Sequence, residues 1–158
     1  MPVQDPELAV DLARDVLGQV APQELPLFDV TSEFYRRDPD AVEAQAGSDD
    51  MLGFGAEVIT AMTPVVLSVA GAVVNVLLDQ VRAAAKAESE GVVRGIVRRL
   101  FRSAGAHRDS DVEPSIALTA EQLGAVRRAA LDQARALKLP DPDANLLADA
   151  MVGRLATA

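Results

Sequence analysis

The chain has 158 residues, of which 49% are hydrophobic but only 3% aromatic, and it contains neither Trp nor Cys. The absence of cysteine excludes disulfides, thiolate zinc sites and cysteine nucleophiles, while the scarcity of aromatic residues favours an all-α fold over an aromatic-rich β-sandwich. A formal net charge of −9 argues against nonspecific nucleic-acid binding, so we expect no nucleic-acid partner.

The charge is distributed unevenly along the chain. Residues 1–57 carry thirteen acids and three bases, whereas residues 79–108 carry three acids and seven bases. Residues 109–158 are again acidic, with eight acids and five bases. The basic middle section leaves room for a local contact with an anionic surface.

Residues 1–47 predict an acidic N-terminal helical segment. Asp5 is a suitable helix cap, Pro6 stands just inside the helix, and Glu7 lies in its first turn, where a carboxylate is favourable. Acidic residues interrupt this terminus before an apolar core could form, which argues against a secretory signal. An apolar residue recurs at every fourth position and forms one stripe: Leu8, Leu12, Val16 and Val20.

The N-terminal pattern changes at two prolines. Pro22 and Pro26 are expected to break the first helix, and a second segment then places Phe34 and Tyr35 near Phe28. Three of the five aromatic residues therefore lie close together in the sequence. This cluster predicts a small satellite core that holds the first helix, with a partner-docking patch as the alternative.

The longest uncharged stretch is VITAMTPVVLSVAGAVVNVLL, residues 58–78. As a helix it would rise about 31 Å, which matches a hydrocarbon core of about 30 Å. A soluble amphipathic helix would show a charge on its solvent face every third or fourth residue, and this stretch shows none. It therefore predicts either a single membrane span or a central helix enclosed by a larger bundle or an oligomer, and both interpretations stay open.

Within this stretch we distinguish residues that would face lipid from residues that would pack against another helix. The positions that would define the membrane span are Val58, Val65, Val69, Val73 and Leu77. Small side chains let helices approach closely. The positions that would form a helix-packing face are Ala61, Ser68, Gly71 and Ala72.

Residues 48–103 are expected to form a long hydrophobic helix that continues into a basic amphipathic helix. In VVRGIVRRLFR, apolar residues share one helical face and basic residues the other. Such a helix can lie among lipid headgroups or pack on its own domain with solvated arginines. The residues assigned to contact anionic lipid or a partner are Arg94, Arg98, Arg99 and Arg102.

Residues 104–114 read as a linker, and residues 115–158 predict a C-terminal helical hairpin. Thr119 is the expected cap of its first helix, with Gln122 at the spacing of a capping box. The expected apolar face of the first helix is Leu123, Val126, Ala130, Leu131, Ala134 and Leu137. That of the second helix is Leu146, Leu147, Ala150, Met151 and Leu155.

Candidate chemistry is sparse. His107, the sole histidine, stands in the polar linker and predicts an exposed side chain more than a metal ligand. The stretch from Asp141 to Asn145 resembles the start of a calcium loop, but Leu146 replaces the required glycine and Val152 the bidentate glutamate. We therefore expect no catalytic residue, no metal and no cofactor.

Two functional hypotheses follow, both non-enzymatic. In the first, the protein is a membrane-associated helical adaptor or effector that holds partners at the membrane or inserts into it. The positive-inside tendency then predicts the inner (cytoplasmic) membrane, with residues 79–158 in the cytoplasm. In the second, it is a soluble, cytoplasmic all-α oligomeric scaffold that buries residues 58–78 in its core. The expected partners are a lipid membrane, a protein partner or both, together with other copies of the chain.

Overall fold

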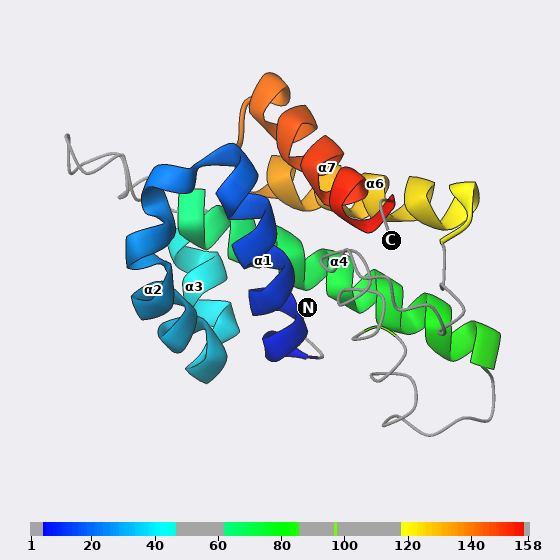
Figure 1. Cartoon of the computed structure of the whole chain (residues 1–158), viewed down its shortest axis with the longest axis horizontal. Helices are drawn as coiled ribbons and strands as arrows, with labels where there is room; N and C mark the ends of the chain where they lie inside the picture. Colours follow the sequence, from blue (N-terminus) through cyan, green and yellow to red (C-terminus); the bar gives the residue numbers. More distant parts are fainter. Residues whose placement is uncertain (1–4, 47–61, 86–96, 98–117, 157–158) are drawn as a thin grey trace, which may run out of the picture.

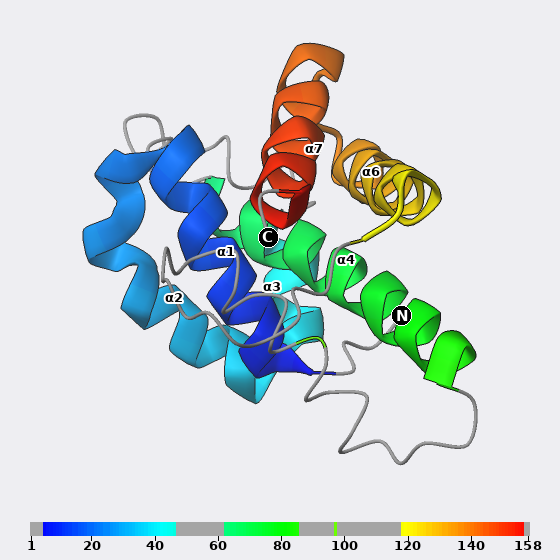
Figure 2. The ribbon, with the colours of Figure 1, turned by 45° about the vertical axis from the view of Figure 1, so that its right-hand side comes forward.

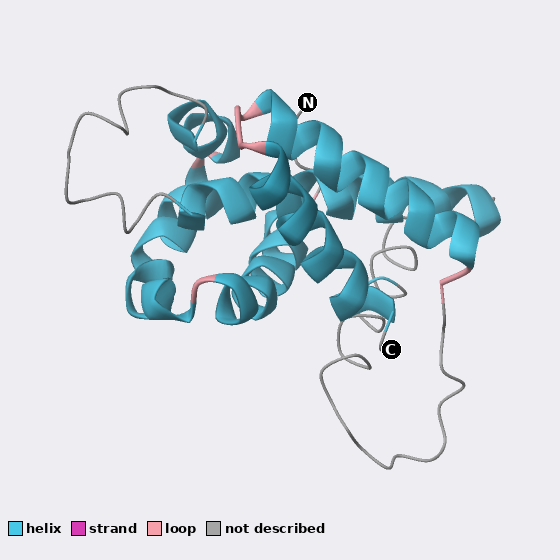
Figure 3. Ribbon diagram, turned by 90° about the horizontal axis from the view of Figure 1, so that it is seen from above, coloured by secondary structure: helices cyan, strands magenta, loops and turns pink. Residues whose placement is uncertain are grey.

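The computed structural model describes residues 5–46, 62–85, 97 and 118–156. Helices joined by loops make up these residues, which contain no strand (Figures 1 and 3). The elements in chain order are α1 (Pro6–Val20), the 3₁₀ turn η1 (Pro22–Glu24), α2 (Leu25–Arg37), α3 (Pro39–Ala46), α4 (Met62–Ala85), α6 (Ala120–Ala136) and α7 (Asp141–Ala156). The predicted all-α class is confirmed, with one long apolar helix and a C-terminal hairpin.

Helix α4 is the central element. It packs against α1, α2 and α3 from the N-terminal part of the chain and against α6 from the C-terminal hairpin. In Figure 2 it crosses the molecule with α2 on one side and α6 on the other. Its buried side chains lie all around the helix, so the chain itself encloses a helix that has no charged residue before Asp79. They include Val65, Val66, Leu67, Val69, Val73, Val74, Leu77 and Leu78.

By length and composition α4 could also cross a membrane. An 18-residue window within Met62–Ala83 has a mean hydropathy of 1.8, and 78% of that window is buried inside the fold. A buried core helix of a soluble protein has the same length and composition, so these properties alone are weak evidence for a span. Four of the five residues assigned to the span, namely Val65, Val69, Val73 and Leu77, are buried in this core. Val58 lies outside the described residues.

Helix α1 begins as its sequence predicts. Asp5 Oδ1 accepts hydrogen bonds from the backbone N–H groups of Glu7 and Leu8, at 3.1 and 3.2 Å. The predicted stripe faces inward, with Leu8, Leu12 and Val16 buried and Val20 half-buried. Alanines beside the stripe are buried as well, because α1 packs against both α4 and α7.

Helix α1 ends at Val20, before the two prolines as expected, and each proline stands at the start of the element that follows. Pro22 opens the turn η1, and Pro26 lies in the first turn of α2, where its missing N–H costs no hydrogen bond. Phe28 and Tyr35 are fully buried, but they belong to the same hydrophobic core as α1 and α4 and not to a separate satellite core, and Phe34 is exposed. Phe34 precedes Tyr35 by one position and therefore points about 100° away around the helix.

The first helix of the C-terminal hairpin, α6, also begins at its predicted cap. Gln122 N donates to Thr119 Oγ1 at 3.1 Å, and Thr119 N donates to Gln122 Oε1 at 2.8 Å, which completes the capping box. Lys138, with φ of 68°, turns the chain toward α7. Leu147 is buried but Leu146 is exposed, contrary to the expected apolar face, because the two side chains point about 100° apart and the buried face of α7 is centred on Leu147 and Met151.

The hairpin is attached to the N-terminal helix. Helix α7 packs on α1, and Arg154 Nε donates to Asp15 Oδ2 at 2.8 Å. A second guanidinium nitrogen of Arg154 contacts the same oxygen. A membrane topology that puts the two ends of the chain on opposite sides would require α1 and α7 to separate.

Candidate functional site

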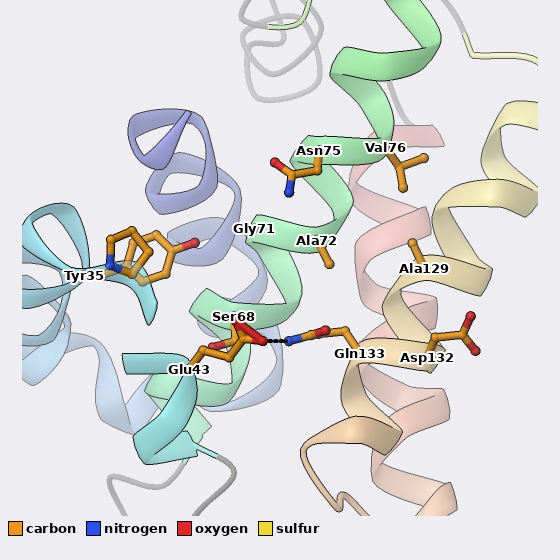
Figure 4. Close-up of a pocket in the computed structure, with 11 residues that line it drawn as sticks. Tyr35, Glu43, Ser68, Gly71, Ala72, Asn75, Val76, Ala129, Asp132 and Gln133 are labelled. Atoms are coloured by element: carbon orange, nitrogen blue, oxygen red, sulfur yellow. Dashed lines mark hydrogen bonds between the residues drawn. The ribbon is translucent and has the colours of Figure 1, made fainter. Parts of the chain in front are cut away.

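A cavity of about 410 Å³ lies between the α2–α3 region, α4 and α6. Figure 4 shows its walls, with Tyr35 reaching from α2 toward Gly71 of α4. Glu43 of α3 and Gln133 of α6 meet below the middle of the view, beside Ser68 of α4. The cavity is therefore built from three parts of the chain that are far apart in sequence.

Small residues of α4 form one wall of the cavity. Gly71 has no side chain and Ala72 only a methyl group, so the face of α4 between Ser68 and Asn75 is recessed. Ser68, Gly71 and Ala72 are three of the four residues assigned to a helix-packing face. All three line this cavity, whereas Ala61 lies outside the described residues.

The hydroxyl group of Tyr35 is buried without a hydrogen-bond partner among the described residues. The side chain is 0% exposed. Burial, followed by the negative charges of Glu43 and Asp40, raises the pKa of Tyr35 above its usual value, so the hydroxyl stays protonated. An unpaired buried hydroxyl costs about 1–3 kcal/mol. A polar group placed in the cavity would recover part of that free energy.

Ser68 provides a second hydroxyl group of the same kind on the wall formed by α4. The residue is 5% exposed, and its Oγ has no hydrogen-bond partner in the described part of the chain. Serine within a helix commonly donates to the backbone carbonyl four residues earlier. Because Ser68 does not, its donor and acceptor capacity remains available to the cavity.

The charged side chains that line the cavity are acidic. Gln133 Nε2 donates to Glu43 Oε1 at 2.9 Å and joins α6 to α3 (dashed line in Figure 4). Asp132 contributes a second carboxylate, and the buried Asn75 contributes an amide. The described lining residues include no Lys, Arg or His. The charged groups of this described lining are Glu43 and the exposed Asp132.

A second feature lies on the outer side of α2. Leu27, Val30 and Phe34 are 49%, 60% and 59% exposed, and their spacing of three and four positions places them on one helical face. We call these three residues the α2 apolar face. The aromatic cluster in the sequence gave a partial signal for it, since Phe34 belongs to both.

The remaining residues singled out in the sequence lie outside the described residues or at the start of α7. Arg94, Arg98, Arg99, Arg102 and His107 lie outside the described residues. Asp141 and Asp143 stand in the first turn of α7, and Asn145 Nδ2 donates to the carbonyl oxygen of Asp141 at 2.9 Å. Within the described ranges, no group of three or more His, Cys, Asp or Glu side chains could hold a metal ion.

The cavity residues were not identified from the sequence as a group. Glu43 and Gln133 are separated by 90 positions, and no motif connects them with Tyr35. No protein family, curated protein or solved structure matches this chain. Any function of the cavity and of the α2 apolar face is therefore inferred from the residues that form them.

Proposed function

We propose that the protein acts by binding and not by catalysis, as an all-α adaptor that keeps α4 in its own core and docks a protein partner on the α2 apolar face. The observation that carries this proposal is the exposure of Leu27, Val30 and Phe34 side by side on one helix. Single exposed apolar residues are ordinary on soluble proteins, but contiguous large ones mark interaction sites.

The two-sided character of α2 supports this proposal. Phe28 and Tyr35 bury one face of the helix against the rest of the fold, while Leu27, Val30 and Phe34 project from another. A surface helix ordinarily has polar residues opposite its buried face. A helix with apolar residues on both faces can bury all of them only when a second surface covers the outer face.

The charge of the surrounding helices indicates which partner fits. Residues 5–46 contain ten acids and three bases. Two of these bases are held in ion pairs, Arg14 with Asp29 at 2.7 Å and Arg36 with Glu7 at 2.6 Å. An acidic surface attracts a basic partner and repels an anionic membrane. The partner is therefore a protein that presents apolar side chains within a basic surface.

A photo-crosslinking amino acid placed at position 30 in the full chain tests this proposal in native cells. Gln19, exposed on α1, provides the matched control position. We expect position 30, and not position 19, to give a discrete adduct with a basic protein, and Phe34→Ser to reduce its yield at least threefold. An adduct with a second copy of the chain or with lipid would contradict the proposal, as would equal labelling at both positions.

A second candidate function is insertion into a membrane, as an effector or as an adaptor at the inner leaflet. The length and mean hydropathy of α4 favour it, since 22 residues rise about 33 Å as a helix. Insertion would require α4 to leave α1, α3 and α6. The basic segment around Arg94 would then meet anionic lipid on the cytoplasmic side.

Fractionation of the unmodified chain distinguishes these candidates. A carbonate-resistant membrane pellet supports insertion, and a soluble monomer or complex supports the adaptor. If the pellet holds the protein, Val69→Arg should move it to the soluble or degraded pool, because arginine at the centre of a span costs about 2.5–3.5 kcal/mol. An unchanged pellet would contradict insertion through α4.

A further inference from the structure

We propose that the cavity between the α2–α3 region, α4 and α6 binds a small organic cation, namely an amine that also carries a hydroxyl group. This site is separate from the α2 apolar face, because Leu27, Val30 and Phe34 do not line the cavity. It can therefore exist whether or not the adaptor function is correct.

The two unpaired hydroxyl groups define the polar end of the ligand. Tyr35 and Ser68 are each at least nine-tenths buried, contribute to the cavity lining, and lack a hydrogen-bond partner among the described residues. A hydroxyl group can donate one hydrogen bond and accept others. A ligand hydroxyl would therefore give either side chain the partner that it lacks.

The carboxylates define the charge of the ligand. Glu43 and Asp132 both line the cavity, and no cationic side chain does so in the described part of the chain. The amide of Gln133 donates to Glu43 but carries no net charge to offset it. The attraction between a carboxylate and a cation is stronger next to the low-dielectric interior of a protein than in bulk water. An ammonium group is therefore attracted, and an anion is repelled.

The size and the walls of the cavity define the body of the ligand. Its volume of about 410 Å³ is near the lower end of the range of about 300–1,000 Å³ for small-molecule sites. Ala72, Val76 and Ala129 add apolar surface between the polar groups. A short hydrocarbon chain with an amine at one end and a hydroxyl at the other matches this lining.

Tyr35 makes the proposal directly measurable. It is the sole tyrosine of a chain without tryptophan, so the tyrosine fluorescence of the full-length protein comes from the cavity wall. We would titrate the protein at constant ionic strength with three terminally substituted four-carbon probes: aminobutanol, butanediol and hydroxybutyrate. We expect a saturable change with the amine, and at least about tenfold weaker binding of the neutral and anionic probes, because a charged hydrogen bond is the stronger one.

Three variants locate the bound amine. Glu43→Gln keeps the size of the side chain and an acceptor for Gln133 but removes the charge, and should weaken aminobutanol binding about tenfold. Ala72→Leu should abolish binding by filling the cavity. Asp143→Asn removes one charge from an exposed position on α7, outside the cavity lining, and should leave the affinity unchanged. Circular dichroism checks that each variant is folded.

Two results would overturn the proposal. One is the absence of any saturable change with aminobutanol, which would mean that the cavity does not bind the hydroxyl-bearing amine. The other is unchanged affinity in folded Glu43→Gln protein, which would place the bound amine elsewhere. If Ala72→Leu fails to fold, the comparison of Glu43→Gln with Asp143→Asn still decides between these outcomes.

Discussion

Glu24 and Thr63 are 39 positions apart in sequence and form a buried contact in the fold. Glu24 Oε1 accepts one hydrogen bond from the backbone N–H of Thr63 at 2.9 Å and another from its hydroxyl group at 2.6 Å. Both residues are 2% exposed. Because Thr63 is the second residue of α4, the carboxylate satisfies a first-turn amide and lies near the positive end of the helix dipole. The turn η1 thus holds the start of the apolar helix.

We expect Glu24→Ala to lower the free energy of unfolding by about 2–3 kcal/mol, because it leaves two buried donors of Thr63 without their partner. Glu24→Gln should cost less, since its carbonyl oxygen can still accept. Urea denaturation followed by circular dichroism measures both. Glu33→Ala removes an exposed carboxylate from α2 and serves as the control. Equal losses in Glu24→Ala and Glu33→Ala would contradict the proposed role of the contact.

Phe28 and Phe34 provide a matched test of the two faces of α2. Phe28 is fully buried, whereas Phe34 belongs to the α2 apolar face. Phe28→Ala should therefore lower the free energy of unfolding by about 3–5 kcal/mol, and Phe34→Ala should change it by no more than about 0.5 kcal/mol. The same denaturation experiment compares them. A large loss in Phe34→Ala would show that Phe34 is part of the monomer core and not of a docking face.

The helix starts could be predicted because they depend on neighbouring residues. Asp5 satisfies amides two and three positions later, and Thr119 and Gln122 bond each other across a single turn. Such interactions depend little on the rest of the fold. The end of α1 before Pro22 was also predicted, but Pro26 lies in the first turn of α2, where proline is tolerated, and does not break a helix.

The environment of α4 could not be predicted from its own residues. A helix without charges is suited to lipid and to a protein core alike. Helix α4 is enclosed because it packs against α1, α2, α3 and α6. The spacing of apolar residues in a sequence shows that a helix has an apolar stripe, but it does not show which other helix that stripe contacts. The cavity was missed for a related reason, since it depends on the relative positions of Tyr35, Glu43 and Gln133 in three separate helices.

The ion pair between Asp15 and Arg154 should contribute measurably to the attachment of α7 to α1. The Arg154 side chain is largely buried, with 10% exposure. We expect Asp15→Ala to lower the free energy of unfolding by about 1–3 kcal/mol, because it leaves a buried guanidinium without this partner. The control is Asp29→Ala, which removes the exposed pair with Arg14 and should cost less than about 1 kcal/mol. Similar losses at both positions, measured by urea denaturation, would contradict this prediction.

Tyr35 should make the stability of the protein fall in alkaline solution. Its pKa in the fold lies above the reference value of 10.0, mainly because of burial and secondarily because of Glu43 and Asp40. Between the unfolded and folded pKa values the folded chain retains a proton that the unfolded chain releases. The free energy of unfolding therefore decreases as the pH rises above about 10, by up to about 1.4 kcal/mol per pH unit.

Tyr35→Phe removes both the titrating group and the unpaired hydroxyl. At neutral pH we expect this variant to be as stable as the parent protein or more stable, because it no longer buries a polar group without a partner. Above pH 10 it should lack the tyrosine-dependent part of the decrease. Urea denaturation of both proteins across alkaline pH provides the comparison, and tyrosinate absorbance reports when Tyr35 ionises. If the variant lost stability as steeply as the parent, the buried hydroxyl would not be the group responsible.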